Sequence, residues 1–400
     1  MNEESERRNW RPETRLNHDG EHADRVHGAV IPPLYQNSTH VFDSWDALDA
    51  AFEDRTGTAV YGRQRNPTVA AAEAQLAALA GAERARLFGS GMGAISSALL
   101  ASLRAGDHLV TIDNVYGPAA RFMDSWLAEK AGVSTSFVRG SDPSEFEAAL
   151  TPRTRVIYLE SPSSAKFGLQ DIAAIAEIAR PRGIRVIIDN TWATPLNQRP
   201  LELGADLEIH SASKYLGGHS DLIAGVLLGR AELVDAIATM EAELLGARAA
   251  PFEAWLLLRG LRTLPARMAA HERGGLAVAR FLEGDARIAE VLHPGLPSHP
   301  QHALAQRQMS GSSSLFAFTL ATDDVAAVKR FFDSLVLFRR GVSWGGHESL
   351  VYSISISALK EYTPERFAAM GLRPGDMRVS VGLEHPDDLI ADLAQALDRI

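Results

Sequence analysis

The sequence predicts an α/β fold in two domains, with a mainly parallel sheet covered by helices on both faces. A chain of 400 residues with 46% hydrophobic and 22% charged residues is long enough to form more than one core. From about residue 66 to 249, short apolar segments alternate with amphipathic helical segments, as in βαβ units. After residue 250 this alternation loosens, which indicates a smaller α+β domain at the carboxyl end.

The predicted elements follow this division. Residues 1–65 show no sustained periodicity and contain Pro32 and Pro33, so we expect an extended arm. Residues 66–255 form the large domain and residues 256–400 the small one. In the large domain we expect helices over 68–80, from Ser90, through Trp126 and over 171–180, and strands over 108–112, 156–160, 185–189 and 205–210. In the small domain we expect a long helix over 251–282 and strands over 314–320 and 351–357.

The composition excludes several classes of function. A formal net charge of −10 argues against nucleic acid and anionic membranes as partners, because phosphate binding needs clustered cations. The chain has no cysteine, which excludes disulfides and thiolate chemistry. The polar amino terminus and the lack of a long apolar run favour a cytoplasmic protein. His293, His299 and His302 lack the spacing of a metal site, so we expect no metal.

Three features suggest a site for a phosphorylated cofactor. The turn GSGMGA, at Gly89 to Ala94, opens a helix whose free amides and dipole favour an anion, although such a turn also serves packing alone. Asp189 ends an apolar strand and Lys214 follows the next one, so both are expected at the carboxyl edge of the sheet, where ligands bind. A partly desolvated lysine among small residues favours its neutral amine, which can form a Schiff base.

These three groups together match pyridoxal phosphate, which needs a phosphate cradle, an amine and an acidic partner for its ring nitrogen. Each has a simpler explanation on its own: Asp189 as a turn residue and Lys214 as a solvated side chain. The pattern G-x-G-x-x-A followed by Asp113 also fits a nicotinamide-dependent dehydrogenase. A non-catalytic protein of the same fold is the third alternative.

At these residues the sequence resembles the pyridoxal-phosphate enzymes of cysteine and methionine metabolism, the family of cystathionine γ-synthases and cystathionine β- and γ-lyases. The resemblance runs from about Thr14 to Ile400 and rests on seven motifs in one order: YGRQRNPT, SGMGAI, IIDNTWAT, SASKYLGGHSD, RGLRTLPARM, SWGGHESL and RVSVGLE. It implies the aspartate aminotransferase-like fold, fold type I of pyridoxal-phosphate enzymes.

The resemblance also implies a role for individual residues. Lys214 would bind the cofactor aldehyde, Asp189 would pair with the ring nitrogen, and Tyr116 would stack on the ring. The phosphate would be held by the amides of Gly91 and Met92, the hydroxyls of Ser211 and Ser213, and Tyr61 and Arg63 of a neighbouring subunit. Arg378 would bind the substrate carboxylate, with Ser343 and Trp344 beside it. Catalysis would fall to Lys214, Tyr116 and Tyr61.

The same resemblance implies a homotetramer built from two dimers, with active sites shared across each dimer and an amino acid as substrate. Within the family, three details favour the bacterial cystathionine β-lyases: Trp344 in SWGG, the GHSD after Lys214, and the run MSGSSSLFAF. The asparagine that commonly follows ESP in the synthases and γ-lyases is also missing. We therefore expect β-elimination of L-cystathionine to homocysteine, pyruvate and ammonia, as in methionine biosynthesis. A γ-lyase or γ-synthase is the alternative.

Overall fold

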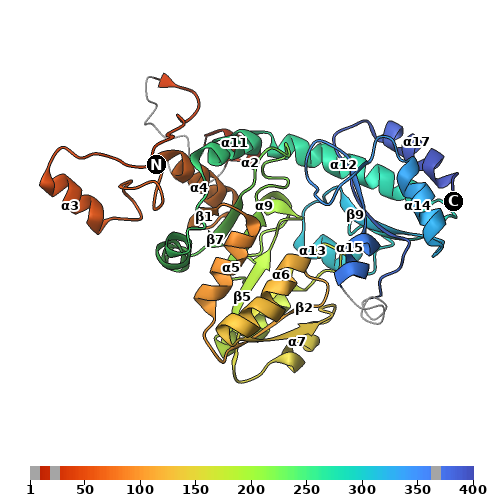
Figure 1. The fold of residues 1–400 in the computed structure, drawn as a ribbon, viewed down its shortest axis with the longest axis horizontal. Coiled ribbons are helices and arrows are strands. Elements are labelled where there is room, and N and C mark those ends of the chain that lie inside the picture. Colours follow the sequence, from red (N-terminus) through yellow and green to blue (C-terminus); the bar gives the residue numbers. More distant parts are fainter. Residues whose placement is uncertain (1–9, 19–27, 362–370) are drawn as a thin grey trace.

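The computed structural model describes residues 10–18, 28–361 and 371–400. Its large sheet has seven strands and lies among helices in the larger part of the molecule (Figure 1). In spatial order the strands are β1 (Arg84–Phe88), β7 (Gly225–Gly229), β6 (Leu207–Ser211), β5 (Arg185–Asp189), β4 (Thr154–Glu160), β2 (His108–Ile112) and β3 (Ser134–Val138). Strands β6, β5, β4, β2 and β3 are parallel, whereas β7 is antiparallel to both of its neighbours. The predicted mainly parallel sheet is confirmed.

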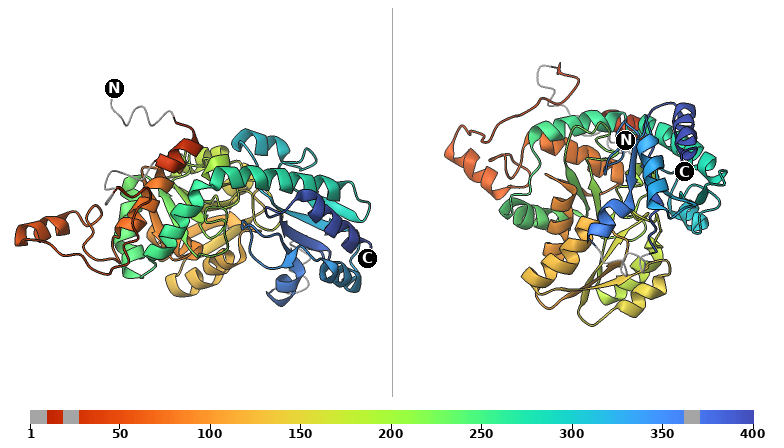
Figure 2. Two further views of the ribbon diagram at one scale, coloured as in Figure 1. Left: turned by 90° about the horizontal axis from the view of Figure 1, so that it is seen from above. Right: turned by 45° about the vertical axis from the view of Figure 1, so that its right-hand side comes forward.

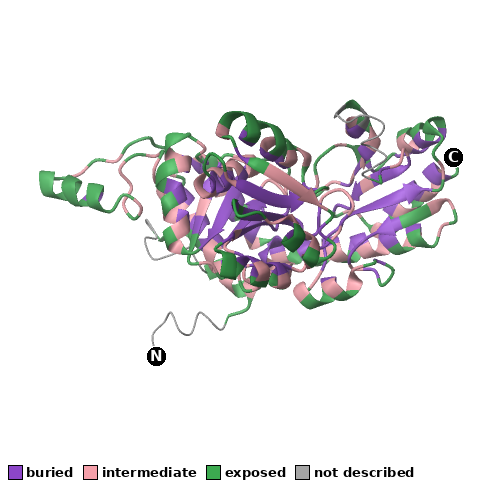
Figure 3. Cartoon of the chain, turned by 90° about the horizontal axis from the view of Figure 1, so that it is seen from below, coloured by how far each residue is buried: buried purple, intermediate pink, exposed green. Residues whose placement is uncertain are grey.

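Helices cover this sheet because their apolar faces need a partner. One core joins β2, β4, β5 and β6 to the helices around them, and a second joins β1 and β7 to α4 and α11. The buried strands form the centre of the molecule in Figure 3. The helical segments are α4 (Pro67–Ala80), α5 (Gly91–Ser102), α6 (Gly117–Arg121), the π-helix η2 (Phe122–Ala131), α7 (Pro143–Ala149), α8 (Ile172–Ala179), the 3₁₀ turn η3 (Arg180–Arg182), α9 (Thr194–Asn197), α10 (Ala231–Ile237), the π-helical turn η4 (Ala238–Ala242) and α11 (Pro251–Arg262).

A second sheet of five strands forms the centre of the smaller domain. Its order is β10 (Arg339–Arg340), β11 (Leu350–Ser353), β12 (Asp376–Ser380), β9 (Leu315–Leu320) and β8 (Ile288–Leu292). A separate core packs this sheet against α12, α14 and α17 (Figure 2). The helices are α12 (Leu264–Glu283), α13 (His302–Gln308), α14 (Val325–Ser334), α15 (Ile354–Glu361) and α17 (Pro386–Leu397). The domain limits at residues 65 and 255 stay predictions.

Two predicted elements of the smaller domain differ from the structure. The expected helix over 251–282 is two helices, because Pro265 begins a new first turn after Thr263. The expected strand over 351–357 ends at Ser353, since β12 pairs with β11 only as far as that residue. Beyond it Ile354 and Ala358, one helical turn apart, pack on Leu372, so the segment continues as α15.

The described part of the amino-terminal arm contains two short helices, and residues 29–44, which precede the second, contain no helix. The first, α2 (Pro12–His18), buries Leu16 against α4. The second, α3 (Trp45–Glu53), projects away from the rest of the chain (Figure 1) and leaves Trp45, Leu48 and Phe52 exposed. Residues 1–9 and 19–27 of the predicted arm lie outside the described residues. None of the helices in the described ranges is both long and apolar enough to cross a membrane.

Candidate active site

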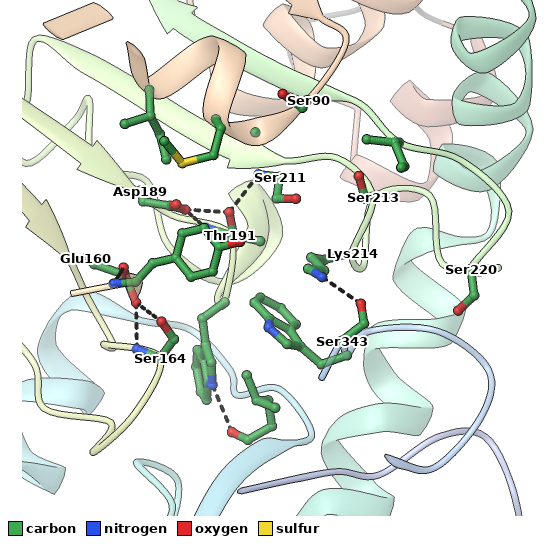
Figure 4. A pocket seen from close by; sticks show the side chains of 18 of the residues that line it. Ser90, Glu160, Ser164, Asp189, Thr191, Ser211, Ser213, Lys214, Ser220 and Ser343 are labelled. Atoms are coloured by element: carbon green, nitrogen blue, oxygen red, sulfur yellow. Dashed lines mark hydrogen bonds between the residues drawn. The ribbon is translucent and has the colours of Figure 1, made fainter. Parts of the chain in front are cut away.

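A cavity of about 440 Å³ opens at the carboxyl edge of the large sheet, beside the segment that precedes β11 (Figure 4). The structure brings most of the predicted site residues into its wall. These are Gly91, Met92, Tyr116, Asp189, Ser211, Ser213, Lys214, Ser343 and Trp344. The arrangement follows from the topology, because β4, β5 and β6 are parallel neighbours and end at the same edge.

Asp189 is a buried acid at the end of β5. Its carboxylate accepts hydrogen bonds from the amide (2.9 Å) and the hydroxyl of Thr191. Burial raises the pKa of Asp189, against the opposing effect of these hydrogen bonds and of His210 and Lys214. No described cationic side chain lies within ion-pair distance of it. A protonated ring nitrogen in the cavity would provide the missing positive charge, so Asp189 fits the role predicted for it.

Lys214 lies on the loop after β6, and its ammonium group reaches the cavity. The Nζ atom donates a 2.6 Å hydrogen bond to the hydroxyl of Ser343 and lies 5.6 Å from the ring centre of Trp344. Burial, followed by repulsion from Arg378, lowers the pKa of Lys214 to about 8, although Asp189 acts in the opposite direction. A far larger fraction of this amine than of a solvated lysine is therefore neutral near neutral pH and able to attack an aldehyde.

The amino terminus of α5 forms an anion cradle against β6 and β7. Ser90 caps the helix by accepting the amide of Gly93 at 3.0 Å, whereas the amides of Gly91 and Met92 have no partner among the described residues. A Cβ on Gly91 would lie 3.1 Å from the Cβ of Ser211. A Cβ on Gly225 would lie 2.2 Å from the carbonyl oxygen of Ser90. Both glycines are needed for this close approach of backbones, which leaves free amides for a phosphate.

The two serines of the lysine loop differ in their availability. The Ser211 amide donates to Thr191 at 2.8 Å, and its hydroxyl makes no hydrogen bond among the described residues. The hydroxyl of Ser213 donates to the carbonyl of Ala224 at 3.2 Å and accepts its amide at 3.0 Å. Ser211 therefore has a free hydroxyl for a phosphate, whereas that of Ser213 already holds the loop on β7.

Tyr116 is held at the cavity by a residue that the sequence analysis missed. The backbone amide of Tyr116 donates to the carboxylate of Glu160 at 2.7 Å, and the same carboxylate accepts the amide of Ser164 at 2.6 Å and its hydroxyl. Desolvation raises the pKa of the Tyr116 hydroxyl, with smaller contributions from Asp189 and Glu160. The signal for Glu160 was present: like Asp189, it is an acid at the end of a buried parallel strand.

Arg378 lies on β12 near this wall without forming part of it. Its guanidinium donates to the carbonyl oxygens of Ser164 at 3.4 Å and Val342 at 2.5 Å, and it stacks 5.2 Å from the ring centre of Tyr352. Burial lowers the pKa of Arg378, which stays a cation. No described carboxylate lies within ion-pair distance of it. Its positive charge is therefore uncompensated, and the guanidinium could donate two parallel hydrogen bonds to a substrate carboxylate.

Tyr61 and Arg63 lie outside the cavity of their own chain. The guanidinium of Arg63 lies 5.5 Å from the Tyr61 ring centre and 3.9 Å from the carboxylate of Glu243, and Tyr61 is 44% exposed. Their contribution to the site of a neighbouring subunit stays a prediction. Other wall residues that the sequence analysis did not identify are Ser90, Thr191, Ser220, Ile223 and Glu348.

The topology disagrees with a dehydrogenase site at the glycine-rich turn. In that alternative Asp113, after β2, would lie beside the turn after β1. These two strands are separated by β7, β6, β5 and β4. Asp113 therefore lies far from the glycine-rich turn. The dehydrogenase alternative required both features in one site, so Asp113 no longer supports it.

A family model described as Cys/Met metabolism PLP-dependent enzyme matches residues 13–398. The chain belongs to this family. The Cys/Met family is PLP-dependent, and the buried acid, the free amine and the cradle described above fit that cofactor. The chain is 42% identical to the L-methionine γ-lyase of Pseudomonas putida over 96% of both chains. It is 40% identical to the L-methionine γ-lyase of Porphyromonas gingivalis over 97% of both chains, and 40% identical to the cystathionine γ-synthase of Mycobacterium bovis over 96% of both.

The predicted membership, cofactor and fold class are thus confirmed. The predicted cystathionine β-lyase specificity is not supported, because these Cys/Met family relatives are γ-lyases and a γ-synthase. The expectation of β-elimination relied on Trp344, on the GHSD after Lys214, on the run MSGSSSLFAF and on the asparagine missing after ESP. Ser164 lies in the segment after ESP and hydrogen-bonds to Glu160. This contact does not distinguish cleavage at Cβ of the substrate from cleavage at Cγ.

Proposed function

We propose that this Cys/Met family enzyme catalyses γ-elimination from a methionine-type amino acid, which with water gives a thiol, 2-oxobutanoate and ammonia. The observation that carries the proposal is the position of Lys214, a partly buried amine with a pKa of about 8 beside Asp189 and Arg378. γ-Elimination requires protons to be removed from both Cα and Cβ, and an amine titrating near neutral pH can take up and return protons in turn. The names of the γ-lyase relatives support the same reaction.

Individual residues of the chain would have separate roles in this reaction. When bound, the cofactor would supply an electron sink for negative charge at Cα. Arg378 would bind the substrate carboxylate, and Ser343 would direct the amine of Lys214. Tyr116, whose phenol stays protonated because its pKa is raised, would donate a proton to the departing sulfur. Its backbone bond to Glu160 would keep that phenol in place.

The far wall of the cavity favours an uncharged or cationic substrate tail. Trp344, Leu222 and Ile223 provide apolar surface, which suits a methylthio group. Glu348 adds a carboxylate that accepts the hydroxyl of Ser220 at 2.6 Å. A substrate with a distal carboxylate, such as an O-succinylated homoserine, would be repelled there.

The experiment is to supply L-methionine, L-cystathionine and O-succinyl-L-homoserine separately to the PLP-loaded enzyme and to identify the oxo acid. We expect 2-oxobutanoate from L-methionine and little turnover of the succinylated substrate. Exclusive formation of pyruvate from L-cystathionine would overturn the proposal in favour of β-elimination. The second candidate is γ-replacement, which the γ-synthase relative supports. It would be established if added L-cysteine diverted the succinylated substrate into cystathionine at a rate exceeding methionine turnover.

We further propose that the active unit is a dimer in which Tyr61 and Arg63 complete the cofactor site of the partner. Their position outside their own cavity and the exposed arm that carries them support this arrangement. A tetramer of two such dimers remains the predicted assembly, and sedimentation of the PLP-loaded enzyme would test it.

A further inference from the structure

A second cavity, of about 400 Å³, lies at the opposite edge of the large sheet from Lys214. It opens where β4 and β5 begin, whereas Glu160 and Asp189 stand where these strands end. The end of α5, the end of α8 and the residue after β7 complete its wall. Its charged and hydroxyl-bearing residues are Ser102, Arg155, Arg180, Arg185, Asp206 and Arg230.

The charge of this wall is unusual for a chain with a formal net charge of −10. Four arginines face the cavity and Asp206 is the one carboxylate among the described residues of the wall. One oxygen of Asp206 already accepts the amide of Val186 at 2.8 Å. The wall therefore carries an excess of positive charge that Asp206 does not balance.

Three of the four arginines lack an ion-pair partner in the described part of the chain. Arg185 donates a 2.7 Å hydrogen bond to the hydroxyl of Ser102 and has no carboxylate within 4.0 Å. The side chains of Arg180 and Arg230 make no hydrogen bond or ion pair with any described residue. Arg155 differs, because its Nε atom lies 3.7 Å from Asp107. Three guanidinium groups without an ion-pair partner in the described part of the chain, from three separate elements, thus face one concave surface.

The local backbone leaves room for these side chains. Gly204 has φ +103°, and a Cβ there would lie 3.2 Å from Nη2 of Arg180. Burial lowers the pKa of Arg185, Asp206 acts in the opposite direction, and repulsion from Arg230 adds a smaller lowering effect. An anion between Arg185 and Arg230 would relieve this repulsion and hydrogen-bond to donors that are unused in the free protein.

We propose that this cavity binds a small molecule through a diphosphate group. A carboxylate has only two oxygens, whereas a diphosphate has enough acceptors for bidentate bonds to Arg180, Arg185 and Arg230 together. The cavity is concave and limited in size, which suits a metabolite rather than a polymer. The site is separate from the cofactor's phosphate cradle, which lies at the amino terminus of α5, because Ser102 ends that helix.

The test is calorimetric titration of the PLP-loaded enzyme with inorganic pyrophosphate, so that the cofactor's own cradle is already filled. We expect saturable binding that weakens at least tenfold in the double variant Arg180→Gln, Arg230→Gln, since this variant loses two guanidinium groups that would donate charge-assisted hydrogen bonds to the diphosphate. The matched control is Arg259→Gln, Arg273→Gln, which removes two exposed arginines outside the cavity and should bind as the wild type does.

Neither variant touches the active site, so both should retain the cofactor and the wild-type rate of turnover without pyrophosphate. A thermal shift gives a second readout, because a ligand that binds only the folded state raises the melting temperature. Absence of binding at millimolar pyrophosphate would overturn the proposal. Equal binding by the two double variants would also overturn it, since it would place the anion elsewhere, for example at Arg378. Citrate binding as tightly as pyrophosphate would reject the diphosphate assignment.

Discussion

Glu160 and Asp189 are register partners at the ends of neighbouring parallel strands, and both carboxyl groups are buried. Two acids at such a position cannot both be ionised without a cost, because they repel each other in a poorly solvated setting. Burial, followed by repulsion from Asp189, raises the pKa of Glu160 to about 7. The free protein therefore retains a proton in this pair at a pH where a solvated glutamate has lost it.

The first prediction concerns the stability of the cofactor-free protein. Because the folded pKa of Glu160 lies above its ordinary value of 4.5, the folded state binds the proton more tightly, and the free energy of unfolding falls as pH rises from about 4.5 to about 7. Glu160→Gln has no titrating group at this position, so it should not show this decrease in the free energy of unfolding. The decrease amounts to roughly 1.4 kcal/mol for each unit by which the pKa is raised in the folded state. In urea unfolding at pH 5, 6, 7 and 8, the free energy of unfolding of the variant should increase relative to that of the wild type up to about pH 7. Glu177→Gln, at an exposed position on α8, should follow the wild-type curve, and an identical curve for Glu160→Gln would contradict the prediction.

The second prediction concerns capture of the cofactor by Lys214. The neutral amine is the nucleophile, and its pKa is about 8, so the rate of PLP uptake by cofactor-free protein should rise with pH and level off above about pH 8. Stopped-flow absorbance would measure that rate, with Nα-acetyl-lysine as the reference amine, whose rate should continue to rise toward pH 10. A protein profile parallel to that of the free amine would show that the amine is not desolvated. Borohydride treatment followed by peptide mapping should place the cofactor on Lys214.

The third prediction tests Asp189 as the partner of the ring nitrogen. Asp189→Asn keeps the side-chain shape but removes the negative charge that would stabilise a protonated ring. We expect a loss of at least tenfold in both PLP affinity and kcat, since a charge-assisted hydrogen bond contributes about 1.5–3 kcal/mol. Equilibrium dialysis measures the affinity and oxo-acid release measures kcat. Asp113→Asn is the control, because that acid lies outside the cavity and its substitution should leave PLP affinity unchanged.

The fourth prediction tests the contact between β7 and α5. A Cβ at Gly225 would lie 2.2 Å from the Ser90 carbonyl oxygen, which belongs to backbone and cannot move aside easily. Gly225→Ala should therefore destabilise the protein by about 1–3 kcal/mol and displace the cradle, with weaker PLP binding. Gly117→Ala is the matched control, because a Cβ there would meet no atom within 4 Å. Unchanged PLP affinity in Gly225→Ala would show that the cradle tolerates the shift.

The fifth prediction tests whether sites are shared between subunits. Lys214→Ala and Tyr61→Phe should each be nearly inactive. When the two are unfolded together and refolded, a mixed dimer has one site with both native residues, so about one quarter of the wild-type activity should return. If Tyr61 acts within its own chain, the mixture stays as inactive as its components.

The sequence predicted the large sheet and its site better than it predicted the remaining elements. Strands such as 108–112 and 185–189 are short apolar runs between amphipathic helices, and both were found with their predicted limits. By contrast, β1 and β7 were missed because arginines and glycines interrupt their apolar pattern, and they are strands because β1 pairs with β7 and β7 with β6. Tertiary pairing of this kind cannot be read from local propensity.

The same distinction holds for the candidate site. Lys214 and Asp189 were identified because each follows or ends a recognisable strand. Glu160 also ends a predicted strand, so its place at the sheet edge could have been predicted, but a single sequence does not show that β4 and β5 are adjacent and that Glu160 therefore lies beside Asp189. The preference for β-elimination was weak for a related reason: motif letters near Trp344 and Ser164 do not report the shape or charge of the wall that Glu348 completes.

The two carbonyl bonds of Arg378 have a consequence for how substrate arrives. One carbonyl belongs to Ser164, which follows β4 of the large sheet, and the other to Val342, which precedes β11 of the small sheet. A carboxylate that takes over the Nη1 donor of this guanidinium would break its hydrogen bond to Ser164, which joins β12 to the loop after β4. Ligand affinity is then offset by the loss of that hydrogen bond, and the domains gain freedom to rotate at the moment of occupancy. Closure of the domains around the bound amino acid would then begin with the loss of the hydrogen bond between Arg378 and Ser164.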